Sequence, residues 1–237
     1  MASVSRTAGR RSLSVTWSVE RSTGSAAAFH ARELAADPSR AIWVLDVIRP
    51  AIVLGSTQPM DHVDLDACRA RHVDVVQRRS GGGAVLLEPL ACTWIDVIIP
   101  RRDQLWSDDV GHAAIWLGES FGRALVRAGA DSSMMGIHRG RLERRPWSAV
   151  VCFAGLGPGE VTVGGRKIVG ISQRRTRTGA RFQTALMHHW QPERLLPLLA
   201  APKPEVAEVA DVAIGVGDLG LDVAVVVVAL LDELSRQ

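Results

Sequence analysis

The chain has 237 residues, 47% of them hydrophobic, and its 28 basic residues against 25 acidic ones give a formal net charge of +3. This apolar content supports an ordinary buried core and excludes a disordered or collagen-like chain. Acidic residues are interspersed with the arginines, so we expect no nucleic-acid partner. Three cysteines without a CxxC spacing argue against a disulfide scaffold or a zinc site. Because no apolar run reaches the roughly 18 residues that span a bilayer, we expect a cytoplasmic protein without membrane contact.

The predicted elements are short strands with a few helices among them. After a flexible N-terminus at residues 1–20, helix formers behind Ser, Thr and Gly predict a first helix at residues 22–36. Further helices are predicted at residues 63–71, 108–128, 192–200 and 221–235. Strands are predicted at residues 41–48, 51–55, 72–77, 91–99, 147–153, 160–163, 167–174 and 180–187, the first two forming a hairpin. Residues 134–146 lack periodicity and predict a mobile loop. This order indicates one α+β domain over residues 21–237, with a mainly antiparallel sheet flanked by helices.

A run of three glycines separates two of these strands, in the sequence RRSGGGAV at residues 78–85. Glycine suits a tight turn with positive φ, which is one reading of the run. The other is that the N–H groups of Gly81, Gly82 and Gly83 bind a ligand, with Arg78 or Arg79 supplying charge for a phosphate. The run is neither a Walker A loop nor a GxGxxG turn.

Lysine is rare in this chain, where only Lys167 and Lys203 stand among the 28 basic residues. Lys203 lies between two prolines, which predicts a surface loop. On the predicted strand, Lys167 shares a face with Val169 and Ile171, so its ammonium either reaches the surface or is held inside by an anion. Because arginine is the usual cation of this chain, we favour the anion.

Together these two segments resemble the biotin/lipoate protein ligase superfamily, most closely its lipoate-protein ligase A and LipM-type octanoyltransferase branches. The motifs are RRSGGGAV at residues 78–85 and GRKIVGISQR at residues 165–174. Gly55 and Gln58 resemble the Gly-x-x-Gln strand end of the family, and the resemblance covers about residues 22–200. It implies a fold like the catalytic domain of class II aminoacyl-tRNA synthetases and biotin ligases.

The resemblance also implies a chemistry. Family ligases activate lipoate or octanoate with ATP as acyl-AMP and pass the acyl group to a lysine of a lipoyl carrier domain. Such domains occur in 2-oxoacid dehydrogenases and in the glycine cleavage H protein, and short ligases use a separate accessory chain. Lys167 would stabilise the charge on the phosphoryl oxygens, Mg²⁺ would accompany ATP, and Glu160 would contact it. The implied binding residues are Arg78, Arg79, Ser80, Gly81, Gly82, Gly83, Ala84, Gly165, Gly170 and Ser172.

Two alternatives stay open. In the octanoyltransferase branch, a cysteine takes the acyl group from acyl carrier protein as a thioester and passes it on without ATP. Cys152 stands where the resemblance places that cysteine, and a cation such as Lys167 would favour its thiolate, although a buried apolar cysteine is the commoner role. The second alternative is a non-catalytic protein that binds an acyl group or a nucleotide.

The sequence also departs from the family at one point. A His-Gly pair in the strand after the lysine motif is usual, and Thr184 and Ala185 stand there instead. This change alters the predicted wall of the acyl pocket and favours the non-catalytic reading. His188 and His189 are candidates for a local substitute.

Overall fold

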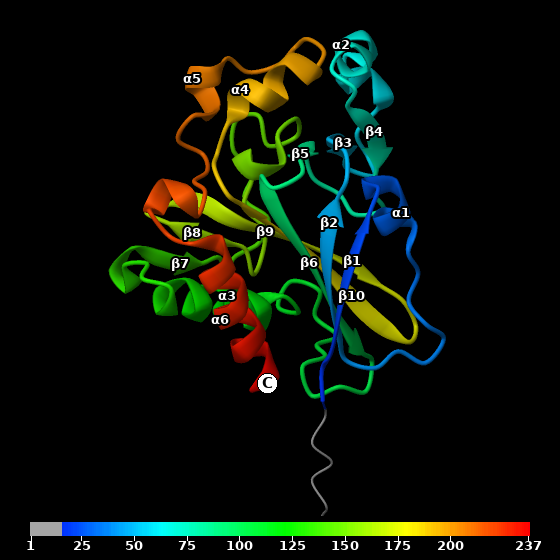
Figure 1. Ribbon diagram of the computed structural model, residues 1–237, viewed down its shortest axis with the longest axis vertical. Coiled ribbons are helices and arrows are strands. Elements are labelled where there is room, and N and C mark those ends of the chain that lie inside the picture. Colours follow the sequence, from blue (N-terminus) through cyan, green and yellow to red (C-terminus); the bar gives the residue numbers. More distant parts are fainter. Residues whose placement is uncertain (1–15) are drawn as a thin grey trace, which may run out of the picture.

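Two β-sheets lie at the centre of the computed structural model, which describes residues 16–237 (Figure 1). The smaller sheet places β3 (Ala51–Leu54) between β4 (Asp74–Gln77) and β5 (Val85–Leu87). The larger sheet has seven strands, of which only the edge pair β1–β2 is parallel. Its order is β1 (Ser18–Gly24), β2 (Ala41–Val47), β6 (Cys92–Pro100), β10 (Gly179–Met187), β9 (Arg166–Arg175), β8 (Val161–Val163) and β7 (Met135–Ile137). The expected α+β class with a mainly antiparallel sheet is confirmed.

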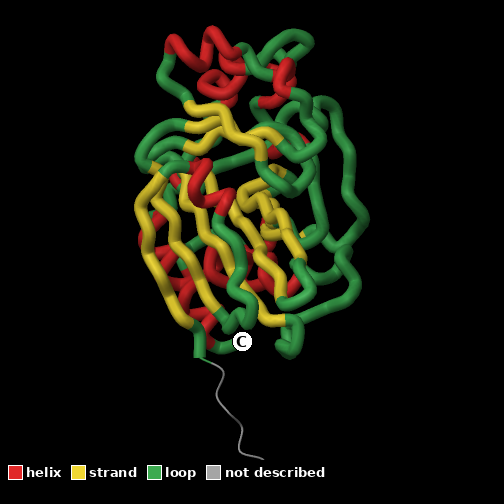
Figure 2. Tube along the Cα trace, turned by 90° about the vertical axis from the view of Figure 1, so that its right-hand side faces the viewer, coloured by secondary structure: helices red, strands yellow, loops and turns green. Residues whose placement is uncertain are grey.

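Helices cover the outer faces of the two sheets. On the large sheet, α3 (Ile115–Arg127) and α6 (Val223–Ser235) pack against each other. Beyond the small sheet, at one end of the molecule, lie α2 (Leu65–Ala70), α4 (Pro192–Leu195) and α5 (Val206–Val209) (Figure 2). The short helix α1 (Ala26–Ala31) follows β1 directly. Among the described residues, none of the helices has the length and apolar character needed to cross a bilayer.

Alternation along the strands builds these layers, because successive side chains point to opposite faces. On β2, Ile42 belongs to the core shared with α3 and α6, whereas Trp43 belongs to the core between the two sheets. On β3, Val53 contributes to that same core between the sheets, whereas Leu54 packs toward the helices beyond. Both strands are therefore apolar on both faces, which explains their continuous hydrophobic runs.

The N-terminal part differs from the sequence prediction. Residues 18–24 form β1, which pairs in parallel with β2, so the predicted first helix shrinks to α1. The side chain of Ser25 caps that helix by accepting from the backbone N–H of Ala28 at 3.2 Å. Residues 18–20 thus lie in the sheet rather than in the flexible N-terminus predicted for residues 1–20, and residues 1–15 lie outside the described part.

Three further predictions of local structure are wrong. Strands β2 and β3 belong to different sheets and form no hairpin, because Arg49 and Pro50 carry the chain from one sheet to the other. Residues 147–153 form turns and the start of a 3-10 helix at Cys152–Ala154 instead of a strand. Part of the predicted loop at residues 134–146 is strand β7, which pairs with β8. Strands β8, β9 and β10 and helices α3 and α6 are confirmed.

Candidate active site

A cavity of about 770 Å³ lies where the glycine loop of residues 80–83 meets strand β9. Its apolar wall comes from the core between the two sheets and includes Val53, Val85, Leu87, Trp94 and Phe153. The sequence-predicted site residues that line it are Arg78, Ser80, Gly81, Gly82, Gly83, Cys152, Glu160, Lys167, Gly170 and Ser172. The fold therefore brings both sequence motifs to one cavity.

The glycine loop approaches its neighbours so closely that side chains would not fit. A Cβ atom on Gly83 would lie 2.6 Å from the carbonyl carbon of Val151, and one on Gly55 would lie 2.0 Å from the carbonyl oxygen of Gly82. Gly82 has a φ of +102°, which favours glycine. A Cβ atom on Gly81 would meet no other atom within 4 Å, so this residue faces open space. The turn reading is thus confirmed at Gly82, and close packing adds a second need for glycine at Gly83, whereas ligand binding by the N–H groups of the loop stays a prediction.

Arg78 holds this loop from inside. Its buried guanidinium donates to the carbonyl oxygens of Gly81 and Gly83, both at 2.8 Å, and to that of Val53 at 3.2 Å. The same Nη2 atom lies 3.8 Å from the Sγ atom of Cys152. Arg78 therefore both holds the glycine loop and places a positive charge beside the thiol.

Lys167 is held inside by an anion of the protein itself. Its Nζ atom lies 2.7 Å from Oε2 of Glu160, and both side chains are buried. Nζ also donates to the carbonyl oxygens of Cys152 and Gly155, each at 3.2 Å. The favoured reading of the sequence, a lysine bound by an anion, is confirmed, and the anion is a carboxylate seven positions earlier in the chain.

Glu160 is fully engaged by donors from the protein. Besides Lys167, its Oε2 accepts from the N–H of Gly157 at 2.7 Å, and its Oε1 accepts from that of Ile171 at 3.0 Å. Within residues 16–237, no group of three or more His, Cys, Asp or Glu residues is arranged to hold a metal ion. This donor set does not fit Mg²⁺, and we assign no step to a metal.

Cys152 is the cysteine that faces the cavity. It begins a 3-10 helix, and its backbone N–H donates to the carbonyl oxygen of Ala84 at 2.9 Å. Burial raises the pKa of the Cys92 thiol to about 12, and burial also raises that of Cys68, which lies behind the small sheet. Neither of these two lines the cavity.

Three of the predicted binding residues lie outside the cavity. The Arg79 side chain is exposed and pairs with Glu33. Gly165 forms the turn between β8 and β9 with a φ of +78°, and Ala84 donates its backbone N–H to Val150 and accepts from the backbone N–H of Cys152. Their contributions are therefore structural or peripheral in this arrangement.

Among the cavity residues that sequence reasoning missed is His30, which projects from α1. Its ring lies against that of Trp94, with centroids 4.6 Å apart, and its Nδ1 atom lies 3.3 Å from Nε2 of Gln183. Burial, together with the charges of Arg181 and Arg78, lowers the pKa of His30 to about 3. A single histidine in an alanine-rich segment has no spacing signal, so the sequence offered no way to find it.

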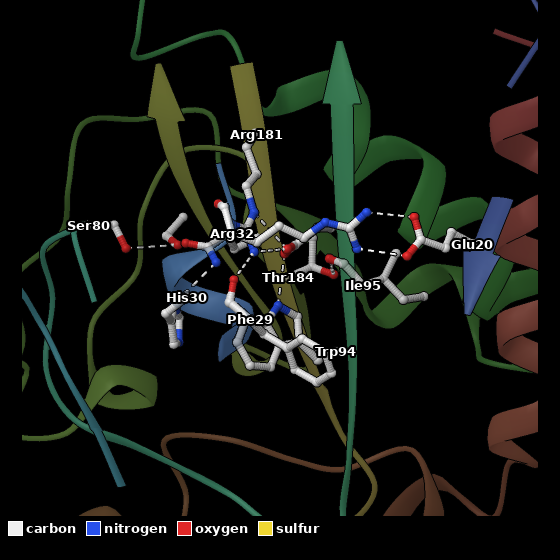
Figure 3. A network of polar contacts seen from close by, with 12 residues as sticks. Glu20, Phe29, His30, Arg32, Ser80, Trp94, Ile95, Arg181 and Thr184 are labelled. Carbon is white, nitrogen blue, oxygen red and sulfur yellow. Dashed lines mark hydrogen bonds and ion pairs between the residues drawn. The ribbon is translucent and has the colours of Figure 1, made fainter. Parts of the chain in front are cut away.

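Arg181 fixes the backbone around His30 (Figure 3). It donates to the carbonyl oxygen of Phe29 at 2.7 Å and to that of Arg32 at 2.6 Å, and it forms a buried ion pair with Asp96. The histidines suggested as substitutes lie elsewhere. His188 contacts Thr93 and the carbonyl of Leu90, and neither it nor His189 lines the cavity. A histidine of α1 thus enters the cavity, and Thr184 and Ala185 also line it, with the Thr184 hydroxyl donating to the carbonyl oxygen of Ile95.

Comparison with curated proteins finds two octanoyltransferases. The chain is 27% identical to octanoyltransferase LipM of Clostridioides difficile (strain 630) over 149 residues, which cover 62% of this chain and 53% of that protein. It is 30% identical to octanoyltransferase LipM of Moorella thermoacetica, with 53% of this chain and 45% of that protein covered. The chain thus matches about half the length of these curated relatives.

Comparison with solved structures confirms the fold. The chain is similar to a bipartite lipoate protein ligase from Thermoplasma acidophilum, studied with its E2 lipoyl domain, with a TM-score of 0.70, 17% identity, and 94% of this chain and 83% of that one covered. It is also similar to a lipoate-protein ligase A bound with ATP, with a TM-score of 0.63, 17% identity, and 93% and 84% covered.

A family model matches most of the chain. Residues 27–221 match the one described as the lipoyl protein ligase A/B catalytic domain, a span that includes both motifs and every residue of the cavity described above. The resemblance stated from the glycine loop and the lysine strand is therefore confirmed. On this evidence the chain belongs to the family of lipoyl protein ligase A/B catalytic domains.

Proposed function

We propose that this chain is an octanoyltransferase that carries the acyl group as a thioester on Cys152 and passes it to a lysine of a lipoyl carrier domain. The observation that supports this most is the position of the thiol, which lines the cavity with the Arg78 guanidinium 3.8 Å away. A cation beside a cysteine favours the nucleophilic thiolate. Two relatives named octanoyltransferase LipM point the same way.

The proposed reaction has two balanced steps. In the first, the Cys152 thiolate attacks the thioester carbonyl of an acylated carrier protein, the carbonyl carbon forms a bond to Sγ, and the carrier thiol leaves and takes up a proton. In the second, a lysine amine of the acceptor attacks this new thioester, an amide forms, and the Cys152 thiol is regenerated. The apolar wall around Phe153 and Trp94 would hold the acyl chain in both steps.

The cations that the ligase mechanism assigns to ATP are already committed in this arrangement. Glu160 offsets the charge of Lys167, Arg78 donates to three carbonyl oxygens, and Arg79 pairs with Glu33 outside the cavity. These residues do not fit a triphosphate, so we derive no step through ATP. Lys167 instead fixes the backbone on both sides of Phe153, next to the proposed nucleophile.

The proposal is tested by measuring intact mass after incubation with octanoyl-[acyl carrier protein]. We expect a gain of one octanoyl group that is lost in Cys152→Ser and kept in the matched variant Cys68→Ser. An isolated lipoyl domain added next should gain that group without ATP. No adduct on Cys152, combined with octanoylation of the lipoyl domain that requires ATP and free octanoate, would support the ligase instead. Binding without any transfer would support the non-catalytic alternative.

A further inference from the structure

His30 carries a polar atom that has no hydrogen-bond partner among the described residues. Five buried side-chain nitrogen or oxygen atoms in residues 16–237 are in this position, and three of them belong to residues lining the cavity. These three are His30 Nε2, His62 Nδ1 and Gln173 Oε1. A buried donor without an acceptor is costly, by about 1–3 kcal/mol, so such atoms mark places where a ligand can complete a hydrogen bond.

The neighbours of His30 determine what its Nε2 atom can do. The Gln183 side-chain amide donates to Nδ1 at 3.3 Å, so the ring proton lies on Nε2 and this atom is a donor. The ring is neutral at physiological pH, because burial lowers its pKa to about 3. Its Nε2–H group therefore suits a neutral or negatively polarised acceptor.

The sheet register places the residue that holds this donor away from Lys167. The Cε atom of Lys167 lies 3.4 Å from a Cβ position on Gly170, and Gly170 pairs with Ala185. Gln183, which holds the His30 ring, lies two residues further along β10, roughly 7 Å at the usual rise of a strand. The cavity thus has a polar end at Cys152 and Lys167, an apolar wall, and a second polar point at His30.

We infer that His30 is a specificity-determining residue whose Nε2–H binds a hydrogen-bond acceptor in the distal part of the acyl chain. This inference rests on the proposed function, since it takes the acyl group to be attached at Cys152. The site then accepts the plain octanoyl chain of the proposed function and binds more tightly a medium-length acyl group with an oxygen or sulfur near its far end. The lipoyl group, with two sulfur atoms, and hydroxylated or keto acyl groups belong to this class.

The test is a competition between two donors, octanoyl-[acyl carrier protein] and 8-hydroxyoctanoyl-[acyl carrier protein], for loading of Cys152, with the two adducts separated by intact mass. We expect the wild-type protein to favour the hydroxylated chain about tenfold, the ratio that one hydrogen bond supplies. His30→Leu should lose this preference, and His30→Gln, which keeps an N–H donor, should recover part of it. The matched control His112→Leu changes an exposed histidine outside the cavity and should keep the wild-type ratio.

Two outcomes overturn the inference. One is equal loading of both chains by the wild-type protein, and the other is an unchanged ratio in His30→Leu. A merely structural role of His30 would lower loading of both chains by the same factor and leave their ratio unaltered. If no adduct forms on Cys152 at all, the proposed function fails, and thermal stabilisation by the free acids tests His30 separately. Greater stabilisation by 8-hydroxyoctanoate than by octanoate, lost in His30→Leu, would then support the inference, and equal stabilisation would refute it.

Discussion

Lys167 and Glu160 form a buried ion pair across the turn between β8 and β9, with Nζ 2.7 Å from Oε2. Both charges are almost entirely buried, since the two side chains are 3% and 7% exposed. Each therefore depends on the other and on the backbone groups around it. The pair joins the strand that carries the family lysine to the segment that begins with Cys152.

Removing one member of this pair should destabilise the protein strongly. Glu160→Ala leaves an uncompensated ammonium in the interior, for which we expect a loss of about 3–5 kcal/mol in the free energy of unfolding. Urea denaturation measures this value. The double variant Glu160→Leu with Lys167→Met should recover most of the loss, because no isolated charge remains. A surface control, Asp66→Ala, breaks the exposed pair with Arg69 and should leave the midpoint unchanged. A loss in Glu160→Ala no larger than that of the control would contradict this expectation.

Arg78 should control the reactivity of Cys152. Arg78→Met removes the guanidinium 3.8 Å from Sγ, and we expect the rate of Cys152 alkylation by iodoacetamide at pH 7 to fall about tenfold. Peptide mass spectrometry after timed quenching gives this rate. Arg79→Met is a matched control, since its side chain is exposed and pairs with Glu33. Equal rates in the two variants would show that Arg78 acts only as a support of the loop.

Gly83 and Gly81 should respond differently to alanine. A Cβ on Gly83 would lie 2.6–2.7 Å from backbone atoms of Val151 and Cys152, so Gly83→Ala must displace the segment that holds the thiol. We expect it to cost about 1–3 kcal/mol and to reduce acyl loading of Cys152. Gly81 has open space at the same position, so Gly81→Ala should change stability by less than about 0.5 kcal/mol. Chemical denaturation and intact mass measure the two effects, and similar results for both variants would refute the role of close packing at Gly83.

His30 should make folding sensitive to acid. Its pKa is about 3 in the folded protein and about 6.5 in an unfolded chain, so between these values the unfolded state binds one more proton. The free energy of unfolding therefore falls as pH drops from 6.5 toward 3, by at most about 1.4 kcal/mol per pH unit from this group. His30→Leu removes the contribution, and its urea midpoint should depend less on pH in this window. Parallel pH profiles for both proteins would show that His30 does not titrate as described.

The hydrophobic pattern predicted the strands near the site, but it did not show which strands pair in one sheet. The short apolar runs at residues 167–174 and 180–187 predicted strands, and they are β9 and β10. Strands β2 and β3 are apolar on both faces, and this feature does not reveal that they belong to different sheets. The segment before Cys152 has β-branched and aromatic residues typical of a strand, yet it packs closely against Gly83 and Ala84 and forms turns that lead into the 3-10 helix at Cys152–Ala154. Tertiary contact overrides propensity here.

Some residues of the candidate site could likewise be predicted from the sequence, and others could not. The glycine loop and Lys167 could be predicted, because a run of glycines is typical of a tight turn and lysine is rare in this chain. The partner of Lys167 had a weaker signal, because Glu160 and Lys167 stand on either side of the turn at Gly164 and Gly165. The family resemblance assigned Glu160 to a metal instead of to this ion pair. His30 depends on Arg181, far along the chain, for the course of its backbone, and no local pattern records that contact.

The scarcity of lysine has a consequence for chemoselectivity. The Nζ atom of Lys167 is bound to a carboxylate and two carbonyl oxygens, and that of Lys203 donates to the carbonyl oxygen of Leu199 at 2.8 Å. Both amines are thus held by acceptors of the protein itself. A catalyst that forms amides on the lysines of other proteins would in this way present almost no competing amine side chains of its own.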